Sequence, residues 1–229
     1  MKEAVIVSGG NIDRDFALDF LKDKIEEKGR DAVCLLAADR GLEFFAETLF
    51  VPDMAVGDFD SLSQAGRKLL ESFEAQGMSV CRLRPEKDDS DTQSALMRAI
   101  FMGFRRVFLL GATGGRIDHL LANLELLSLG DKLGAEVVVV DERNYISLIP
   151  SGTALARKSQ FGRYVSFFPV GGDVTGLTLT GFKYPLTRHH LTVTDSGLTL
   201  SNEITGENGT VTYDSGSLLM IQSKDGIQH

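Results

Sequence analysis

Long apolar runs and positive charge are both scarce in this chain of 229 residues. No apolar run approaches the roughly 18 residues that a membrane-spanning helix needs, so no transmembrane segment is expected. The N-terminal residues enter a strand-like run directly and lack the layout of a signal peptide. A net charge of −8 disfavours a nucleic-acid partner, because basic side chains hold such partners by their phosphates.

Cysteine, histidine and tryptophan are also rare or absent. The two cysteines, Cys34 and Cys81, lie in apolar runs. This predicts buried free thiols in a reducing cytoplasm, with a disulfide as the alternative. The cysteines and the four histidines show no zinc-site spacing, and the chain has no tryptophan. The hydrophobic content of 43% is nevertheless ample for a globular core.

The composition changes near residue 150. Residues 1–150 hold 18 Lys and Arg against 26 Asp and Glu, whereas residues 151–229 hold 6 of each. Threonine rises from 3 residues in the first segment to 11 in the second. Because threonine favours strands and acidic residues are depleted from them, we expect two domains of different class, 1–150 and 151–229.

In the first domain, apolar strand-like runs alternate with amphipathic helical patterns. Strands are expected at 4–8, 32–37, 54–56, 79–83, 106–110 and 136–140, and helices at 13–28, 42–49, 62–76, 91–102 and 117–127. This alternation predicts right-handed βαβ crossovers. The expected fold is therefore a mostly parallel, Rossmann-like α/β sheet with helices on both faces.

Shorter strand-like runs follow residue 150 and are separated by turns that contain glycine. They cover 164–169, 177–180, 198–200, 210–213 and 218–221. Their spacing predicts a small all-β domain, either an antiparallel sandwich or a barrel.

Two aspartates follow the third expected strand, in the turn Gly57-Asp58-Phe59-Asp60-Ser61. Residues i and i+2 of an extended segment point the same way, so Asp58 and Asp60 can converge on one point. Two converging carboxylates repel unless a proton or a cation lies between them, and Mg²⁺ delivered with phosphates suits this position. The alternative is that Asp60-Ser61 caps the next helix.

Other carboxylates follow neighbouring strands at the edge where open α/β sheets bind ligands. Asp39 follows the second strand, and Lys87-Asp88-Asp89-Ser90-Asp91 follows the fourth. Asp88 and Asp91 would share one helix face, although acidic residues also suit a helix N-terminus without any ligand. Lys87 is either a phosphate contact or a solvated side chain.

A glycine turn, Gly111-Ala112-Thr113-Gly114-Gly115-Arg116, follows the fifth strand and precedes Asp118 and His119. It lacks the Gly-Lys-Ser/Thr ending of a P-loop, but its backbone N–H groups and Arg116 could cradle an anion. The alternatives are a generic turn and a surface hydrogen bond between His119 and Asn123. Together these strand ends predict a site for a Mg²⁺-bound nucleoside polyphosphate, with a carboxylate that activates a hydroxyl nucleophile.

The motifs Gly57-Asp58-Phe59-Asp60-Ser61, Lys87-Asp88-Asp89-Ser90-Asp91 and Gly114-Gly115-Arg116-Ile117-Asp118-His119 occur in the order and spacing of bacterial thiamine pyrophosphokinases. A fourth match is Gly197-Leu198-Thr199-Leu200-Ser201-Asn202-Glu203, flanked by Tyr184-Pro185-Leu186 and Ser215-Gly216-Ser217-Leu218-Leu219. The chain therefore resembles this family over nearly its whole length.

The resemblance implies transfer of a pyrophosphoryl group from Mg-ATP to the hydroxyethyl arm of thiamine, which gives thiamine diphosphate and AMP. It implies an α/β domain that binds ATP and Mg²⁺, followed by a thiamine-binding β-sandwich. It also implies a homodimer with the active site at the subunit interface.

Residue roles are implied by the same resemblance. Asp58, Asp60 and Asp91 would hold Mg²⁺ and the triphosphate, and Asp91 or a neighbour in the catalytic set such as Asp88 would assist deprotonation of the thiamine hydroxyl. Ser201 and Asn202 would belong to the thiamine side. The expected ATP-side residues are Asp39, Lys87, Thr113, Gly114, Gly115, Arg116, Asp118 and His119.

Two departures from the family pattern leave questions open. The segment Ala38-Asp39-Arg40-Gly41 differs from the family's Ala-Asp-Gly-Gly turn, and this difference leaves the role of Asp39 unassigned. Relatives place an aromatic residue near Ser217 that could stack on thiamine, and without tryptophan the stacking partner in this chain is not identified.

Two other functions use the same residues. One is a metal-dependent phosphohydrolase, or a kinase of another small alcohol, with the same acidic edge. The other is a nucleotide-sensing or ligand-storage module without turnover, which has little need for so many converging carboxylates.

Overall fold

The computed structural model describes residues 2–84, 86, 88–195 and 197–226. The chain divides into two compact units, Met1–Glu142 and Arg143–His229. The boundary lies before 150 because strand β7 (Asn144–Ile149) pairs along its whole length with strand β12 (Ser215–Ser223) of the second unit. Lys87 lies outside the described residues.

The strands of the first unit pair in parallel, in the order β4-β3-β2-β1-β5-β6. Strands β1 and β2 are buried along their whole length, which explains why they read as continuous apolar runs. Because all the strands run in one direction, their carboxyl ends meet at one edge. Their bounds are β1 Glu3–Val7, β2 Val33–Ala38, β3 Met54–Gly57, β4 Ser79–Arg82, β5 Arg106–Leu110 and β6 Glu136–Val140.

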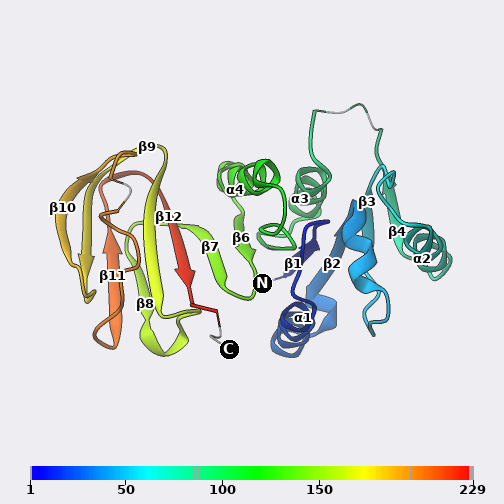
Figure 1. Cartoon of the computed structure of the whole chain (residues 1–229), viewed down its shortest axis with the longest axis horizontal. Coiled ribbons are helices and arrows are strands. Elements are labelled where there is room, and N and C mark those ends of the chain that lie inside the picture. Colours follow the sequence, from blue (N-terminus) through cyan, green and yellow to red (C-terminus); the bar gives the residue numbers. More distant parts are fainter. Residues whose placement is uncertain (1, 85, 87, 196, 227–229) are drawn as a thin grey trace. The chain divides into compact units, whose positions relative to one another are not determined.

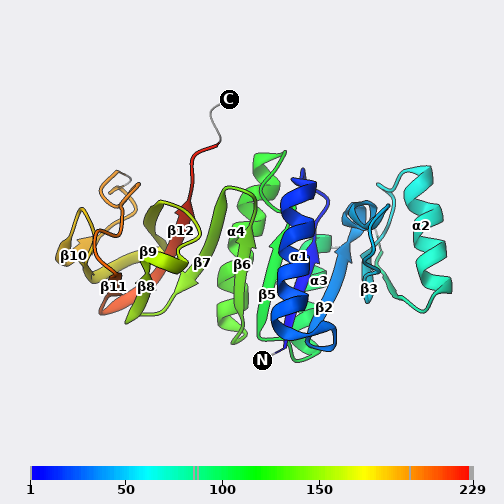
Figure 2. The same ribbon diagram turned by 90° about the horizontal axis from the view of Figure 1, so that it is seen from below.

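Helices cover both faces of this sheet. Figures 1 and 2 show α1 on one side of the strands and α3 and α4 on the other. The helices are α1 (Arg14–Lys28), α2 (Gln64–Ala75), α3 (Asp91–Phe101) and α4 (Ile117–Lys132), with the short 3₁₀ segments η1 (Arg30–Ala32) and η2 (Asp39–Phe45). Within the described residues, none of the helices combines the length and apolar character needed to cross a membrane.

One helix expected in the first unit is different in the structure. The apolar pattern at 42–49 predicts an α-helix, but η2 begins earlier, at Asp39, and ends at Phe45. Leu42, Phe44 and Phe45 are all buried within these few residues, so packing fixes a tight turn that helix periodicity does not describe.

The second unit is built of antiparallel strands. Its strands are β7, β8 (Thr153–Ala156), β9 (Tyr164–Thr180), β10 (Leu186–Leu191), β11 (Asn208–Thr212) and β12, with the 3₁₀ turn η3 (Arg157–Ser159). The first half of β9 pairs with β12, and the second half pairs with β10 and β11. Buried side chains from both halves of β9, among them Phe167, Leu177 and Leu179, belong to one hydrophobic core cluster.

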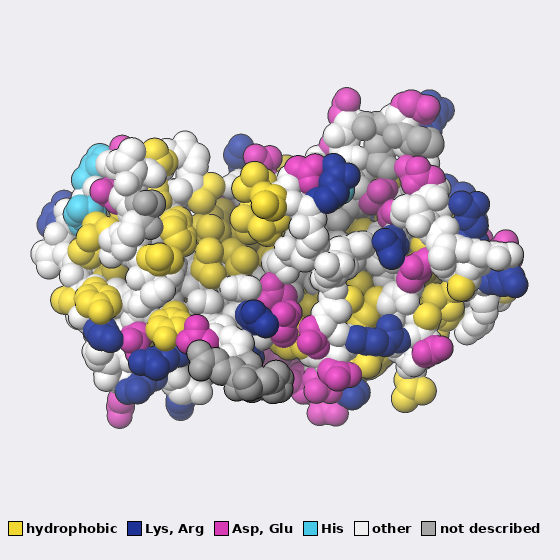
Figure 3. Space-filling view, viewed as in Figure 1, with side chains coloured by type: hydrophobic (Ala, Val, Ile, Leu, Met, Phe, Trp, Pro, Cys, Tyr) yellow, Lys and Arg dark blue, Asp and Glu magenta, His cyan; other side chains and the backbone are white. Residues whose placement is uncertain are grey.

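Three details of the second unit differ from the sequence reading. The runs at 164–169 and 177–180 belong to the single strand β9, because Gly171, at φ 72°, lets the chain bend without ending the strand. The run at 198–200 is a turn in which Thr199 is buried and its hydroxyl donates to the Phe167 carbonyl. Strand β10, which carries His189 and His190, is not covered by any of the expected runs, and Figure 3 shows histidine side chains at the surface there.

Candidate functional site

Three aspartates meet at the carboxyl ends of β2 and β3. Asp39, Asp58 and Asp60 each offer a carboxylate oxygen, and these oxygens lie within 4.8 Å of one another. Asp39 adopts φ 46° directly after β2. A Cβ at position 57 would fall 3.0 Å from the Asp39 Cα. Glycine at the end of β3 therefore allows the two strand ends to approach closely.

A folded turn brings Asp58 and Asp60 together. Phe59, between them, adopts φ 62° and buries its ring, and the Asp60 N–H donates to Asp58 Oδ1 at 3.1 Å. The sequence predicts that the two carboxylates converge, but by an extended i, i+2 arrangement. The geometry differs because burial of Phe59 turns the backbone into the left-handed region.

The helix-capping explanation for Asp60-Ser61 is wrong. Ser63 is the N-cap of α2 and accepts from the Gly66 N–H at 3.0 Å. The Ser61 hydroxyl instead donates to Asp39 Oδ2. Asp60 and Ser61 are thus not needed to begin α2, and Ser61 joins the acidic group.

The acidic group has the chemistry of a cation site. The second oxygen of Asp39, Oδ1, is buried and has no hydrogen-bond partner among the residues that the structure describes. A buried carboxylate oxygen without a partner is costly unless a cation or a donor reaches it. Oxygen ligands from carboxylates are those that Mg²⁺ prefers, so the residues present fit a magnesium ion.

The segment before α3 lies at the same edge but outside this group. Ser90 caps α3 by accepting from the Gln93 N–H at 3.1 Å, and Asp91 is the first residue of the helix. Next to it, the buried Thr92 hydroxyl donates to Ser8 Oγ at 2.9 Å, which fixes this helix end to the end of β1. Asp88 is exposed. The structure therefore groups Asp39, and not Asp91, with Asp58 and Asp60.

The glycine turn after β5 interlocks with the loop after β1. The Gly10 N–H donates to the Gly111 carbonyl at 3.0 Å, and the Asn11 N–H to the Gly114 carbonyl at 3.4 Å. A Cβ at Gly10 would fall 2.4 Å from the Gly111 oxygen, and Gly111 adopts φ 63°. The residues Gly9-Gly10-Asn11 were missing from the predicted site, although a glycine pair at the end of the first strand could have revealed them.

The N-terminus of α4 carries an exposed ion pair. Arg116 Nε donates to Asp118 Oδ1 at 3.1 Å, and this hydrogen bond lowers the pKa of Asp118 and raises that of Arg116. His119 is exposed, and only its backbone N–H is recorded as a donor to Asp118. Asn123 is buried and donates to the Ala112 carbonyl at 2.9 Å, so the predicted surface pair of His119 and Asn123 is wrong. Thr113, Gly114 and Gly115 form the turn between these anchors.

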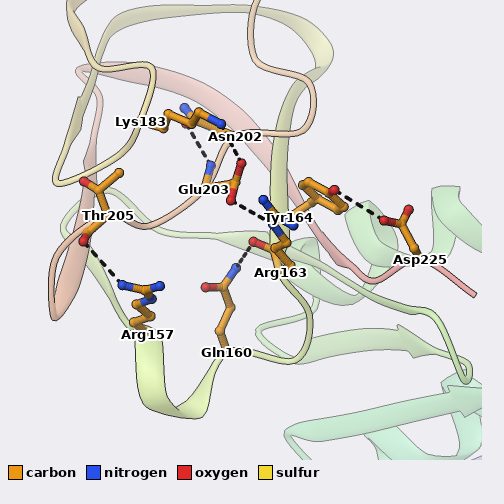
Figure 4. A network of polar contacts seen from close by, with 9 residues as sticks. All are labelled: Arg157, Gln160, Arg163, Tyr164, Lys183, Asn202, Glu203, Thr205 and Asp225. Carbon is orange, nitrogen blue, oxygen red and sulfur yellow. Dashed lines mark hydrogen bonds and ion pairs between the residues drawn. The ribbon is translucent and has the colours of Figure 1, made fainter. Parts of the chain in front are cut away.

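In the second unit, Ser201 and Asn202 have opposite environments. Ser201 is exposed at φ 52°, whereas Asn202 is 1% exposed. Glu203, the next residue, accepts hydrogen bonds from Arg163 and Lys183, which lower its pKa to about 2. Figure 4 shows Asn202, Glu203, Arg163 and Lys183 within a network of polar contacts.

Two family models match the chain: "Thiamin pyrophosphokinase, catalytic domain" over residues 26–139, and "Thiamin pyrophosphokinase, vitamin B1 binding domain" over residues 153–218. The chain is similar to the thiamine pyrophosphokinase of Bacillus subtilis, with 37% identity over 190 residues, 83% of this chain and 87% of that protein. A crystal structure of thiamine pyrophosphokinase from Bacillus subtilis superposes with a TM-score of 0.85 at 34% identity, covering 98% of this chain and 100% of that one. The enzyme from Geobacillus thermodenitrificans gives a TM-score of 0.82 at 37% identity, with 98% and 99% covered.

Proposed function

The chain belongs to the thiamine pyrophosphokinase family and transfers a pyrophosphoryl group from ATP to thiamine, and from this premise we propose which of its residues perform the reaction. The observation that carries the proposal is the group formed by Asp39, Asp58 and Asp60, with its partnerless buried oxygen. These three carboxylates hold Mg²⁺. When bound, the ion offsets the negative charge of the triphosphate. Asp39 thereby takes a role that its altered sequence context leaves unassigned.

The glycine turn and Arg116 bind the phosphates. The start of α4 offers backbone N–H groups without a side-chain cap, a favourable environment for an anion. Arg116 is exposed and paired only with Asp118 in the contacts that are recorded for its side chain, so a phosphate can compete for its guanidinium. Thr113, Gly114, Gly115, Asp118 and His119 complete the ATP side, together with Lys87, which lies outside the described residues.

Asp91 is the proposed base, with Asp88 nearby in sequence. In the transfer step the thiamine hydroxyl oxygen bonds to the β-phosphorus of ATP, and the hydroxyl proton passes to the carboxylate. The bond between the β-phosphorus and the oxygen that bridges it to the α-phosphorus breaks, and AMP leaves with that electron pair. The protein contributes position and charge complementarity, as is usual in phosphoryl transfer.

The second unit is proposed to be a β-sandwich that binds thiamine next to Ser201. The vitamin B1 binding model over residues 153–218 and the exposure of Ser201 support this assignment. We further propose a Rossmann-like class for the first unit and a cytoplasmic homodimer with the active site at the subunit interface. The family resemblance supports the dimer, and the free thiols of Cys34 and Cys81 are consistent with a reducing compartment.

One assay tests the reaction and separates the alternatives. The purified protein is incubated with Mg-ATP, with and without thiamine, and AMP and phosphate are measured. AMP formed only with thiamine supports the proposed function. Phosphate release regardless of thiamine would identify a hydrolase, and ATP binding without turnover would identify a sensor.

A further inference from the structure

Asn202 is 1% exposed, and its side-chain amide makes three hydrogen bonds within the second unit. Its Oδ1 accepts from the Tyr184 N–H at 3.0 Å and from the Glu203 N–H at 2.9 Å. Its Nδ2 donates to the Tyr184 carbonyl at 2.8 Å. The side chain thus binds both backbone groups of Tyr184, as a neighbouring strand would.

The backbone of Asn202 is fixed as well. Its N–H donates to the Val165 carbonyl at 2.9 Å, and its carbonyl accepts from the Val165 N–H at 2.8 Å. Asn202 therefore joins three segments that are far apart in sequence: the start of β9, the segment before β10, and the turn that carries Ser201. With the side chain and the backbone occupied in this way, the residue has little capacity left to bind a ligand.

Ionic contacts at the surface reinforce the junction of these three segments at Asn202. Glu203 accepts from Arg163 Nε at 2.9 Å and from Lys183 Nζ at 2.9 Å. Arg163 precedes β9 and Lys183 precedes Tyr184, so these two ion pairs tie the same segments that Asn202 joins through its backbone and its side chain (Figure 4). Exposed pairs of this kind add little stability individually, and their effect is to restrict the turn.

Ser201 and Tyr184, which adjoin this junction, are both exposed to solvent. Ser201 adopts φ 52°, which is unfavourable for a residue with a side chain, and its N–H is held by Ser166 Oγ at 2.9 Å. The Tyr184 side chain is 54% exposed. An unfavourable backbone conformation persists only where the surroundings impose it, and here Asn202 supplies the adjoining constraint.

We propose that Asn202 is a positioning residue for thiamine, which acts through the placement of Ser201 and Tyr184 and does not itself contact the substrate. This rests on the proposed function, because it presumes that thiamine binds beside Ser201. The Tyr184 ring, exposed and held by its backbone, is the aromatic surface that this junction offers to the flat rings of thiamine, of which the thiazolium ring is cationic.

The substitution Asn202→Asp tests the inference with almost no change in shape. The aspartate keeps an acceptor for the Tyr184 and Glu203 N–H groups but replaces the donor to the Tyr184 carbonyl with a second oxygen. We expect KM for thiamine to rise at least about tenfold at saturating Mg-ATP, while kcat and KM for ATP change less than twofold, because the variant loses a buried hydrogen bond and places a carboxylate oxygen against the Tyr184 carbonyl. Hydrogen exchange at the amides of residues 182–184 and 201–204 should accelerate in the same variant.

Matched variants keep the test decisive. Asn208→Asp, an exposed position in the same unit, introduces the same charge and should leave all three constants unchanged. If thermal unfolding shows that Asn202→Asp does not fold, Glu203→Gln replaces it, with an expected rise in KM for thiamine of about two- to threefold. In a double-mutant cycle, Asn202→Asp should have a smaller effect when Ser201 is already alanine.

Two results would overturn the inference. One is a fall in kcat or a rise in KM for ATP equal to the change in KM for thiamine, which would indicate a general structural role. The other is full additivity with Ser201→Ala together with unchanged hydrogen exchange, which would indicate direct contact with thiamine. A wild-type protein that forms no AMP on addition of thiamine would instead refute the proposed function, before any variant is compared.

Discussion

Replacing Asp60 with asparagine should abolish transfer and, without metal, make the protein more stable. The Asp60 carboxylate is exposed, and the structure records no hydrogen bond from a described residue to its side-chain oxygens, so the substitution removes charge without breaking a recorded contact. Two other carboxylates offer oxygens within 4.8 Å of it. At that separation, two unit charges repel by about 1 kcal/mol in water and by about 3 kcal/mol at an effective dielectric constant near 20.

The lower value applies to Asp60 because its carboxylate reaches solvent. Relief of repulsion from two neighbours then amounts to about 2 kcal/mol, or roughly 4–8 °C in the melting temperature of a chain of this size. Thermal unfolding in EDTA should therefore show Asp60→Asn melting above the wild type. Adding Mg²⁺ should raise the melting temperature of the wild type and leave that of the variant nearly unchanged.

The matched control is Asp131→Asn, an exposed position in α4 away from the acidic group. It should respond to Mg²⁺ as the wild type does and retain AMP formation. Near-wild-type turnover by Asp60→Asn at saturating Mg²⁺ would refute the metal-site assignment. A lower melting temperature in EDTA would refute the reasoning about repulsion.

Three further substitutions test other parts of the molecule. Glu3 is 1% exposed at the start of β1, with Lys24 Nζ 3.4 Å from its Oε2, so Glu3→Gln should lower the unfolding free energy by about 3 kcal/mol in urea titrations while kcat is retained. A Cβ at Gly41 would fall 1.9 Å from the Val7 carbonyl oxygen, so Gly41→Ala should reduce turnover more than tenfold, with near-native helix content by circular dichroism; unchanged turnover would contradict the close packing of the strand ends. The pKa of Glu203 is lowered from 4.5 to about 2, so the stability from its charge is present above pH 4.5 and is lost as the pH falls toward 2. The difference in melting temperature between the wild type and Glu203→Gln should accordingly be constant from neutral pH to about 5 and shrink below 4.5, and a difference that grows on acidification would contradict this.

The first unit could be predicted almost element by element because its signals are local. Strands β5 and β6 begin and end at the residues that their apolar runs indicate, and the runs for β1 to β4 lie within one or two residues of the observed bounds. Strands β1, β2, β5 and β6 are buried over most or all of their length, so continuous hydrophobicity is a sufficient signal for them.

The second unit was predicted less well because its partners are distant in sequence. Strand β10 carries polar and histidine residues, and only its pairing with β9 makes it a strand. Strand β7 was assigned to neither domain pattern, since its partner β12 lies at the other end of the unit. Strand propensity depends on such neighbours more than helix propensity does.

The candidate site shows the same division between local and distant information. Asp58 and Asp60 could be selected from one pentapeptide and its position after a strand. The inclusion of Asp39, however, depends on the absence of a side chain at Gly57, which lets two strand ends touch. The burial of Asn202 and Asn123 likewise depends on carbonyl groups that no sequence spacing reveals.

Strand β9 limits how the second unit can be divided or rebuilt. Because one continuous segment supplies the edge for β12 in its first half and for β10 and β11 in its second, a break near Gly171 would leave strands on both sides without a partner. Unpaired edges of this kind invite aggregation. A split-protein reporter or a circular permutant of this enzyme should therefore avoid residues 164–180, and the exposed turn at Ser151-Gly152 offers a better place for new chain ends.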